Sequence, residues 1–275
     1  MRAAMTSFAS APTRDAVRPD GRFGGRVNRA PLPPLGAVEL SDEARREIAS
    51  VWLVQAATEA RVATSFAIVR ASLDELGADP GLIRLAARAV DDEHRHAALC
   101  EDVAGRYLGH VVSPYAPLPD QRPDHPGASP ELRRALFVVG QCCLNETFAS
   151  AYLDVARRGA TIPLATAAVR ALLSDEIDHA RIGWAFVQTL PTAVRDGLQA
   201  WLLPLTVCNL REWRRIHLPS DDRLAAHGIP AWSDAQAGIT EALEGVVLEG
   251  FRHAGFDTRA LERWARRGAP VGEVV

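Results

Sequence analysis

Residues 92–96 read Asp-Glu-His-Arg-His and residues 175–179 read Asp-Glu-Ile-Asp-His, so each stretch contains a glutamate followed three positions later by a histidine. In a helix, residues three apart lie on one face, about 5–6 Å from each other. Each stretch can therefore present one carboxylate and one imidazole to the same metal ion. A single Glu-x-x-His is a weak signal, because surface ion pairs and buried structural histidines produce the same pattern.

Two further glutamates strengthen the metal-binding interpretation. Glu59 lies within an otherwise apolar or small-residue face of residues 54–68, and Glu146 lies within a similar face of residues 135–152. A buried carboxylate without a partner costs roughly several kcal/mol, so each of these glutamates needs a partner. A pair of metal ions would be that partner, and the predicted ligands are Glu59, Glu93, His96, Glu146, Glu176 and His179.

Apolar periodicity and capping residues predict an all-α chain whose first four helices form a bundle. We expect these helices over residues 41–77, 79–109, 131–158 and 163–190. The links are short, long and short, which is the pattern of a four-helix bundle with one crossover connection. A fifth helix and two shorter ones are expected over residues 192–216, 234–252 and 257–267.

The positions of the glutamates can be compared with the positions of the links. In the second hairpin Glu146 and Glu176 lie equally far from the link, which places them at one level of the bundle. In the first hairpin Glu59 lies farther from the link than Glu93 does. At 1.5 Å per residue this is a mismatch of about 7 Å, which the side chains and the true helix ends must absorb.

One domain accounts for most of the chain. Residues 1–40 contain six Arg together with Pro, Gly, Ser and Ala, so we expect a disordered tail there. An organelle transit peptide would have a similar composition. Residues 41–190 would form the metal-binding bundle, and residues 191–275 would add helices that pack on the same domain.

Composition excludes several classes of function. The 31 basic and 34 acidic residues leave a formal charge of -3, which favours neither nucleic acid nor an anionic membrane as a partner. All the basic residues are Arg, and the absence of Lys excludes Schiff-base chemistry and Lys-dependent phosphate loops. Without an apolar run of roughly 18–20 residues or an apolar signal core, we expect a cytoplasmic protein. The four Cys match neither a zinc site nor a redox pair.

Over residues 41–190, the order Glu, Glu-x-x-His, Glu, Glu-x-x-His resembles that of the ferritin-like di-iron carboxylate proteins, of the bacterial oxygenase and oxidase type. The resemblance implies a ferritin-like four-helix bundle that holds two iron ions. Four carboxylates with two imidazoles suit iron or manganese, so a manganese pair or a mixed pair is the alternative.

Asp92-Glu93-x-Arg95-His96 also resembles a motif of the bacterial multicomponent monooxygenases, in which the aspartate accepts a hydrogen bond from a ligating histidine. This resemblance implies that Asp92 orients His179 and that Asp175 orients His96. The alternative is that both acids are exposed beside the ligands. Asp178 occupies the position that Arg95 has in the first motif, so the outer hydrogen-bond network of the second motif must differ.

Three neighbouring positions refine the comparison with such enzymes. Cys100 lies four residues after His96, where ribonucleotide reductase small subunits carry a radical Tyr and methane-oxidising enzymes carry Cys. Cys100 is therefore a candidate catalytic residue, with a small buried apolar residue as the alternative. Ser150 lies four residues after Glu146, where monooxygenases commonly place Thr, and is a candidate proton relay or a core hydroxyl bonded to the backbone. Leu172 replaces the additional His of arylamine N-oxygenases, which argues against N-oxygenation.

The resemblance implies an O2-dependent oxygenase or oxidase that acts on a small organic substrate, and we expect a role in bacterial specialised metabolism. The Arg-only, Ala-rich composition itself suggests only a bacterial genome rich in G and C. Its electrons would come from an external donor such as a reductase or ferredoxin, and the chain could form a homodimer. We expect an apolar pocket lined by Phe66, Phe148, Tyr152 and Trp184. The alternatives are a ferroxidase or metal-binding ferritin relative, whose minimal bundle needs no helices beyond about residue 192, and a tRNA-modifying hydroxylase, which the acidic balance disfavours.

Overall fold

The computed structural model describes residues 31–113, 123–215 and 222–269, and it confirms the all-α prediction. Helices dominate these residues, and no strand occurs among them. The elements before residue 190 are α1 (Asp42–Glu75), α2 (Pro80–Leu108), α3 (Pro130–Val138), η3 (Val139–Asn145), α4 (Glu146–Gly159) and α5 (Pro163–Gln188). Those that follow are α6 (Thr192–Arg215), η4 (Asp222–His227), α7 (Trp232–Ala242), η5 (Leu243–Val247), α8 (Leu248–His253) and α9 (Arg259–Ala265).

The helices of the first half begin where their capping residues predict. The side chains of Ser41 and Asp79 accept hydrogen bonds from backbone N–H groups at the starts of α1 and α2, at 3.2 and 2.7 Å. Ser129 does the same for α3 at 3.2 Å. These bonds satisfy donors that the first helical turn leaves without partners. At its other end α2 stops at Gly109, whose φ of 76° is a left-handed conformation that favours glycine.

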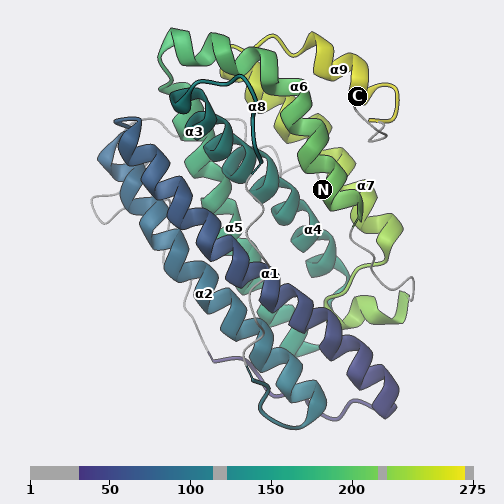
Figure 1. The fold of residues 1–275 in the computed structure, drawn as a ribbon. Coiled ribbons are helices and arrows are strands. Elements are labelled where there is room, and N and C mark those ends of the chain that lie inside the picture. Colours follow the sequence, from purple (N-terminus) through teal and green to yellow (C-terminus); the bar gives the residue numbers. More distant parts are fainter. Residues whose placement is uncertain (1–30, 114–122, 216–221, 270–275) are drawn as a thin grey trace.

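Four long helical segments pack side by side (Figure 1). Helices α1 and α2 form one hairpin, and the line of α3, η3 and α4 forms a second hairpin with α5. The hairpins meet where α2 packs against α5 and where α1 packs against α3 and η3. Helices α6, α7 and α9 belong to a further layer, in which α6 packs on α3 and η3 and α7 packs on α4. This layer covers the second hairpin on the side away from α1 and α2.

The apolar core consists of two clusters that occupy opposite ends of the bundle. On α1, one cluster contains Ile48 and Trp52, and the other contains Phe66 and Leu73. On α2, α4 and α5 the residues are divided between the same two clusters. The two ends therefore meet in the middle of the bundle, where the predicted metal ligands lie.

The segment before α1 departs from the expectation of a tail through residue 40. Residues 1–30 of that tail lie outside the described residues, but Leu32, Leu35 and Leu40 pack against the core cluster that contains Trp52. Arg106 on α2 donates a hydrogen bond to the carbonyl of Pro33 at 2.8 Å. Residues 31–40 are thus held against α1 and α2 by apolar contacts and by a guanidinium group.

The helix expected over residues 131–158 is divided by a π-helical segment, η3, which the sequence did not predict. A π-turn widens the helix and inserts one residue relative to α-helical spacing. Helix α5 accommodates the wide segment at Gly183, where a Cβ atom would lie 2.7 Å from the backbone nitrogen of Cys143 and from the Cβ of Cys142. A glycine inside α5 was the available signal, but it identifies a close approach only when the partner is known.

The C-terminal region contains the expected short helices, with two differences. Residues 232–253 form α7, the π-helical η5 and α8 in succession, and the 3-10 helix η4 was not predicted. Glycines bring these elements close to the bundle: a Cβ on Gly238 would lie 2.5 Å from Val155, and one on Gly250 would lie 2.5 Å from the ring of Trp184. The additional helices therefore pack tightly on α4 and α5.

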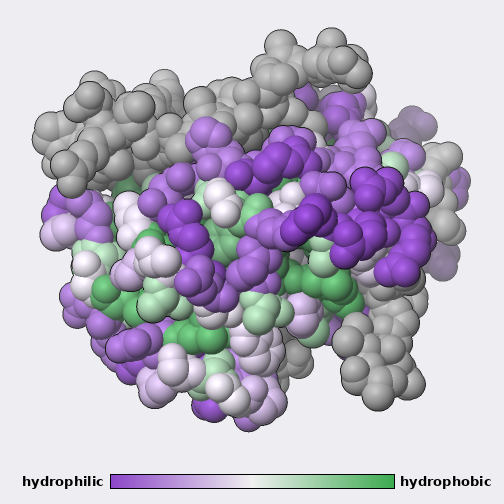
Figure 2. Space-filling model, turned by 90° about the horizontal axis from the view of Figure 1, so that it is seen from above, coloured by the Kyte–Doolittle hydropathy of each residue, from purple (hydrophilic) through white to green (hydrophobic). Residues whose placement is uncertain are grey.

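The described surface is mixed in character. Seen from above, hydrophilic side chains lie between smaller hydrophobic groups (Figure 2). Among the described residues, no helix combines the length and apolar character that crossing a membrane requires.

We expect Gly183→Ala to lower the free energy of unfolding by about 1–3 kcal/mol, because the new methyl group meets the backbone of η3, which cannot move aside like a flexible side chain. Urea unfolding followed by circular dichroism measures this change. The control is Gly245→Ala, since a Cβ at Gly245 meets nothing within 4 Å among the described residues. Equal stability of Gly183→Ala and the parent protein would contradict the close packing of η3 on α5.

Candidate metal centre

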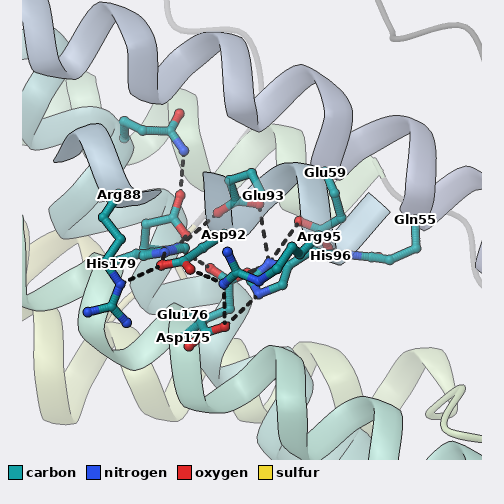
Figure 3. Close-up of polar contacts among 12 residues, drawn as sticks. Gln55, Glu59, Arg88, Asp92, Glu93, Arg95, His96, Asp175, Glu176 and His179 are labelled. Atoms are coloured by element: carbon teal, nitrogen blue, oxygen red, sulfur yellow. Dashed lines mark hydrogen bonds and ion pairs between the residues drawn. The ribbon is translucent and has the colours of Figure 1, made fainter. Parts of the chain in front are cut away.

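The structure brings the predicted ligands together in the middle of the bundle (Figure 3). Helix α1 contributes one glutamate, α2 a glutamate and a histidine, the start of α4 one glutamate, and α5 a glutamate and a histidine. All of these side chains are buried, with at most 4% of the surface of any of the residues exposed. They are Glu59, Glu93, His96, Glu146, Glu176 and His179.

These residues form two groups. Within each group, one ligand atom from every residue lies within 4.8 Å of the others. The first group is Glu59, Glu93, His96 and Glu176, and the second group is Glu93, Glu146, Glu176 and His179. Glu93 and Glu176 belong to both groups. Two metal positions that share two carboxylates are therefore available.

The shared glutamates turn one oxygen toward each histidine. His96 Nδ1 lies 3.4 Å from Glu93 Oε2 and 3.3 Å from Glu176 Oε1. His179 Nδ1 lies 2.9 Å from Glu93 Oε1 and 3.4 Å from Glu176 Oε2. Each imidazole thus directs Nδ1 toward the centre of its group.

The observed helix ends reduce the expected difference in level between Glu59 and Glu93 along the first hairpin. Helix α1 ends at Glu75, before the expected Gly77, whereas α2 begins at Pro80 as expected. The remaining difference of three residues corresponds to about 4.5 Å along a helix. Side-chain length absorbs this distance, because a carboxylate oxygen of Glu59 still lies 3.9 Å from His96 Nδ1.

The two aspartates lie against the outer nitrogens of the histidines. Asp175 Oδ2 is 3.2 Å from His96 Nε2, and Asp92 Oδ2 is 3.5 Å from His179 Nε2. Each aspartate therefore faces the histidine of the other motif, which is the pairing that the resemblance implies. A carboxylate that accepts a hydrogen bond from Nε2–H fixes the orientation of the ring. It also favours the tautomer whose lone pair is on Nδ1, where a metal ion can bind.

Two arginines of α2 lie beside the aspartates, whereas α5 has no arginine at the position that matches Arg95. Arg95 forms an ion pair with Asp92 and lies 3.5 Å from Asp175, and Arg88 lies 3.6 Å from Asp92. Asp178, which occupies the position of Arg95 in the second motif, instead bonds to Arg181 at 2.8 Å. The outer network of the second motif differs from that of the first, as its sequence predicts.

Two glutamines complete the site, and the sequence pattern did not predict either of them. Gln55 Nε2 donates a hydrogen bond to Glu59 Oε1, and Gln141 Nε2 donates one to Glu146 Oε1. Gln55 precedes its glutamate by four residues, whereas Gln141 precedes its glutamate by five because the π-helical turn inserts a residue between them. The available signal was a glutamine four or five residues before each isolated glutamate, although Asn145 also precedes Glu146.

The four glutamates fall into two classes by the direction in which their pKa is shifted. Burial raises the pKa of Glu59 and Glu146 well above the usual range, and the negative charges of Glu93 and Glu176 add to this effect. Burial also acts to raise the pKa of Glu93 and Glu176, but the nearby histidines, and Glu146 for Glu176, outweigh it and hold both pKa values below the usual range. The two shared glutamates therefore favour the charged form more than Glu59 and Glu146 do.

The pKa values of the two histidines are shifted upward. Burial acts to lower the pKa of His96 and His179, but the surrounding carboxylates, including Asp175 beside His96, outweigh it and raise both pKa values well above their usual range. The carboxylates of the site therefore favour the protonated imidazoles.

The site fits a metal pair, because several buried ligand atoms lack a hydrogen-bond partner within the described part of the chain. These atoms are both carboxylate oxygens of Glu93, Oε2 of Glu176, Nδ1 of His96, and Nδ1 and Nε2 of His179. The last of these faces Asp92 at a distance too long for a good hydrogen bond. Buried polar atoms in native proteins are normally satisfied, so atoms of this kind call for an ion. The oxygen-rich donor set suits iron or manganese.

The candidate catalytic residues are both buried near the ligands. Burial raises the pKa of the Cys100 thiol well above its usual range, and the charges of Glu59 and Glu93 reinforce this shift, so the thiol stays protonated. Ser150 Oγ is buried and has no hydrogen-bond partner among the described residues, so the alternative of a hydroxyl bonded to the backbone is not what the structure shows.

The aromatic residues expected to line one pocket are distributed differently. Phe66, Phe148 and Trp184 lie in the larger apolar cluster, where the Phe66 ring centroid is 4.8 Å from that of His179 and the Trp184 indole donates to Thr147 at 3.3 Å. Tyr152 instead lines a cavity beside Gln55. Side-chain direction within the helices, which sequence spacing alone does not give, separates these rings.

The remaining histidines are not gathered at the site. His94 is exposed, as expected for a residue two positions from His96, and His110 and His253 are exposed as well. His125, in the segment before α3, and His227, at the end of η4, are buried at 7% and 6% exposure. His217 lies outside the described residues.

We expect the metal-free protein to lose stability as the pH rises. A group whose pKa is raised by folding stabilises the fold below its unfolded pKa, and this contribution is lost as the pH rises through the folded pKa. Glu59, Glu146, His96 and His179 are all groups of this kind. With a chelator present, the melting temperature should therefore fall between about pH 6 and pH 9. Differential scanning calorimetry measures this, Glu146→Gln should reduce the slope, and a melting temperature that rises over this range would contradict the assignment.

No family model, no curated protein and no solved structure matches the chain. The function is therefore inferred from the residues of the site and from their geometry.

Proposed function

We propose that the protein is a ferritin-like, non-haem di-iron oxygenase or oxidase that uses O2 to act on a small organic substrate. The observation that carries the proposal is the pair of buried ligand groups that share Glu93 and Glu176. Two carboxylates common to both groups are what a pair of adjacent ions requires, and a single ion would leave ligand atoms of one group buried without a partner.

Protonation of the ligands bears on how a metal ion would bind. The pKa values of Glu59, Glu146, His96 and His179 are all raised, so protons compete with a cation for these ligand atoms. Divalent ions would displace these protons. Metal ligands must be deprotonated, so this exchange is the expected course of binding.

A bound pair of ferrous ions would supply the electrons that reduce O2, and an external donor such as a ferredoxin or reductase would replace them. The chain's own residues then have separate tasks. Asp175 holds the imidazole of His96 in the orientation that directs Nδ1 inward, and Asp92 faces the outer nitrogen of His179 at 3.5 Å. The apolar clusters at both ends of the bundle exclude water from the reacting atoms. The buried hydroxyl of Ser150, which has no hydrogen-bond partner among the described residues, would serve to hold or pass a proton.

An iron store is the competing function, and the surroundings of the site do not favour it. A store needs a route that attracts cations, for which acidic side chains are suited. On the histidine side, Arg88 and Arg95 lie between the aspartates and solvent and are about one third exposed, at 33% and 38%. On the Glu59 side, the cavity that reaches Gln55 has no charged side chain in its lining.

We expect the purified protein to bind about two iron ions per chain, because each of the two ligand groups can be satisfied only by its own ion. Glu176→Ala removes a ligand from both groups and should lower iron binding by more than half while the helical circular dichroism spectrum persists. Inductively coupled plasma analysis after anaerobic loading measures the iron. His94→Ala, at an exposed position of the same motif region, should bind iron normally. One zinc ion per chain, or iron loss in His94→Ala, would contradict the ligand set.

We expect the anaerobically reduced, iron-loaded protein to consume about one O2 per iron pair and then to stop until a reductant is added. An oxygen electrode gives this stoichiometry. Addition of free Fe(II) separates the two functions, because an oxygenase should leave it largely unoxidised. Conversion of hundreds of added ferrous ions per assembly into bound ferric ions would establish a store instead.

A further inference from the structure

The two isolated glutamates of the site lie on different kinds of backbone. Glu59 lies within the uninterrupted helix α1, whereas Glu146 directly follows the π-helical η3. The backbone N–H of Glu146 bonds to the carbonyl of Gln141, five residues earlier, which is a π-helical hydrogen bond. The side chain of Gln141 also donates to the Glu146 carboxylate. The position of the glutamate in the second ligand group therefore depends on the π-helical turn.

A π-helical turn needs support from its surroundings. Such turns are rare and occur mostly as single widened turns within α-helices. If η3 changed to α-helical spacing, the residues after it would rotate by about 100° relative to those before it, because an α-helix has about 3.6 residues per turn. This rotation would carry the Glu146 carboxylate away from the other ligands. The contacts that hold η3 in its wide form therefore decide whether the second ligand group is complete.

Two neighbouring helices hold the wide segment between them. On one side Gly183 of α5 lies so close to η3 that a Cβ atom would come within 2.7 Å of the Cys143 backbone nitrogen. On the other side α6 packs against Gly140 of η3. A Cβ atom at Gly140 would lie 3.4 Å from the Leu205 side chain and 3.6 Å from Asn209 Nδ2. Close packing from both sides thus fixes the path of η3.

A hydrogen bond fixes the end of η3 that adjoins the ligand. Asn145 is the last residue of η3 and directly precedes Glu146. The indole Nε1–H of Trp213, on α6, donates to Asn145 Oδ1 at 3.0 Å. This bond joins the layer of α6, α7 and α9 to the residue beside a predicted metal ligand.

Contacts from two more helices keep the Trp213 indole in place. Its ring centroid lies 6.1 Å from that of Tyr152 on α4, and its ring packs against the larger apolar cluster. The Gln236 amide, on α7, reaches the Trp213 carbonyl at 3.5 Å. An indole held in this way restrains Asn145 instead of following its movements.

We propose that Trp213 is a positioning residue for the second ligand group, because its bond to Asn145 holds the end of η3 in the conformation that keeps Glu146 among the ligands. The inference rests on the proposed metal pair and assigns to the additional helices a role in completing one of its two positions. The first group has its isolated glutamate on a continuous helix. An ion in the first group therefore does not depend on Trp213.

Cobalt(II) is a suitable probe, because it accepts oxygen and nitrogen ligands as iron(II) does and has visible absorption bands that depend on those ligands. The full-length protein is titrated with cobalt(II) without O2, so the result does not depend on any oxygenase reaction. Glu59→Gln and Glu146→Gln each disable one ligand group. Their spectra identify the absorption of the ion in the group that remains.

Trp213→Phe keeps an aromatic ring but removes the N–H donor. It should weaken cobalt binding in the second group about three- to tenfold, as expected for one neutral hydrogen bond, and should shift the absorption of that ion. The affinity of the first group should stay within about twofold of the parent value. The control is Trp201→Phe on the same helix, whose ring lies 5.2 Å from that of His125, centroid to centroid. This control should bind both ions as the parent does.

The partner of the bond provides a second test. Asn145→Leu removes the acceptor with little change in volume and should reproduce the effect of Trp213→Phe. Because both substitutions break the same bond, the double variant should bind cobalt about as well as either single variant. Fold-changes that multiply in the double variant would show two separate packing effects and would overturn the proposal. If Trp213→Phe failed to fold, Asn145→Leu would test the bond from the other side.

The outcomes separate this inference from the proposal of a metal pair. A parent protein that bound fewer than two cobalt ions would refute the pair and the role of Trp213 together. A parent that bound two ions would support the pair. The role of Trp213 alone would then be refuted if Trp213→Phe bound both ions like the parent or weakened both ions equally.

Discussion

The structure depends on the cost of placing four carboxylates in one buried layer. Glu93 and Glu176 lie within 4.8 Å of Glu59 in one group and within 4.8 Å of Glu146 in the other, and all four are almost fully buried. Like charges at that distance in a medium of low permittivity repel strongly, so the layer can exist only with cations or protons among the oxygens. The two apolar clusters on either side prevent water from serving in their place. Everything around the layer either supplies positive charge or fixes the position of a ligand.

The supporting residues act at increasing distance from the layer. The glutamines fix the isolated glutamates, the aspartates fix the histidines, and Arg88 and Arg95 hold Asp92 in turn. The type of partner depends on burial. Deep in the bundle the polar groups have neutral or shared partners, whereas arginines form ion pairs where solvent still reaches their guanidinium groups. The two hairpins bring these residues together. The C-terminal helices pack closely on the second hairpin at Gly238 and Gly250.

The sequence predicted the long helices and the six residues that meet in the bundle. Both predictions depend on local spacing, which determines the helix face on which each side chain lies. Capping by Ser41, Asp79 and Ser129 located the helix starts for the same reason. The π-helical η3 and the rings around the site were beyond such reasoning. Each depends on packing between segments far apart in the chain, as when Gly183 admits a widened turn or when Tyr152 faces Gln55 rather than Phe66.

The crossed pairing of aspartates and histidines has a consequence for how the two hairpins are joined. Asp92 faces the histidine of α5 and Asp175 faces the histidine of α2, and each ligand group draws on both hairpins. Each hairpin supplies three of the four residues of one group, and the fourth residue and the acid beside the histidine come from the other hairpin. An ion held by either group would therefore join the two hairpins, so that their separation would require loss of the ion as well as of the apolar contacts.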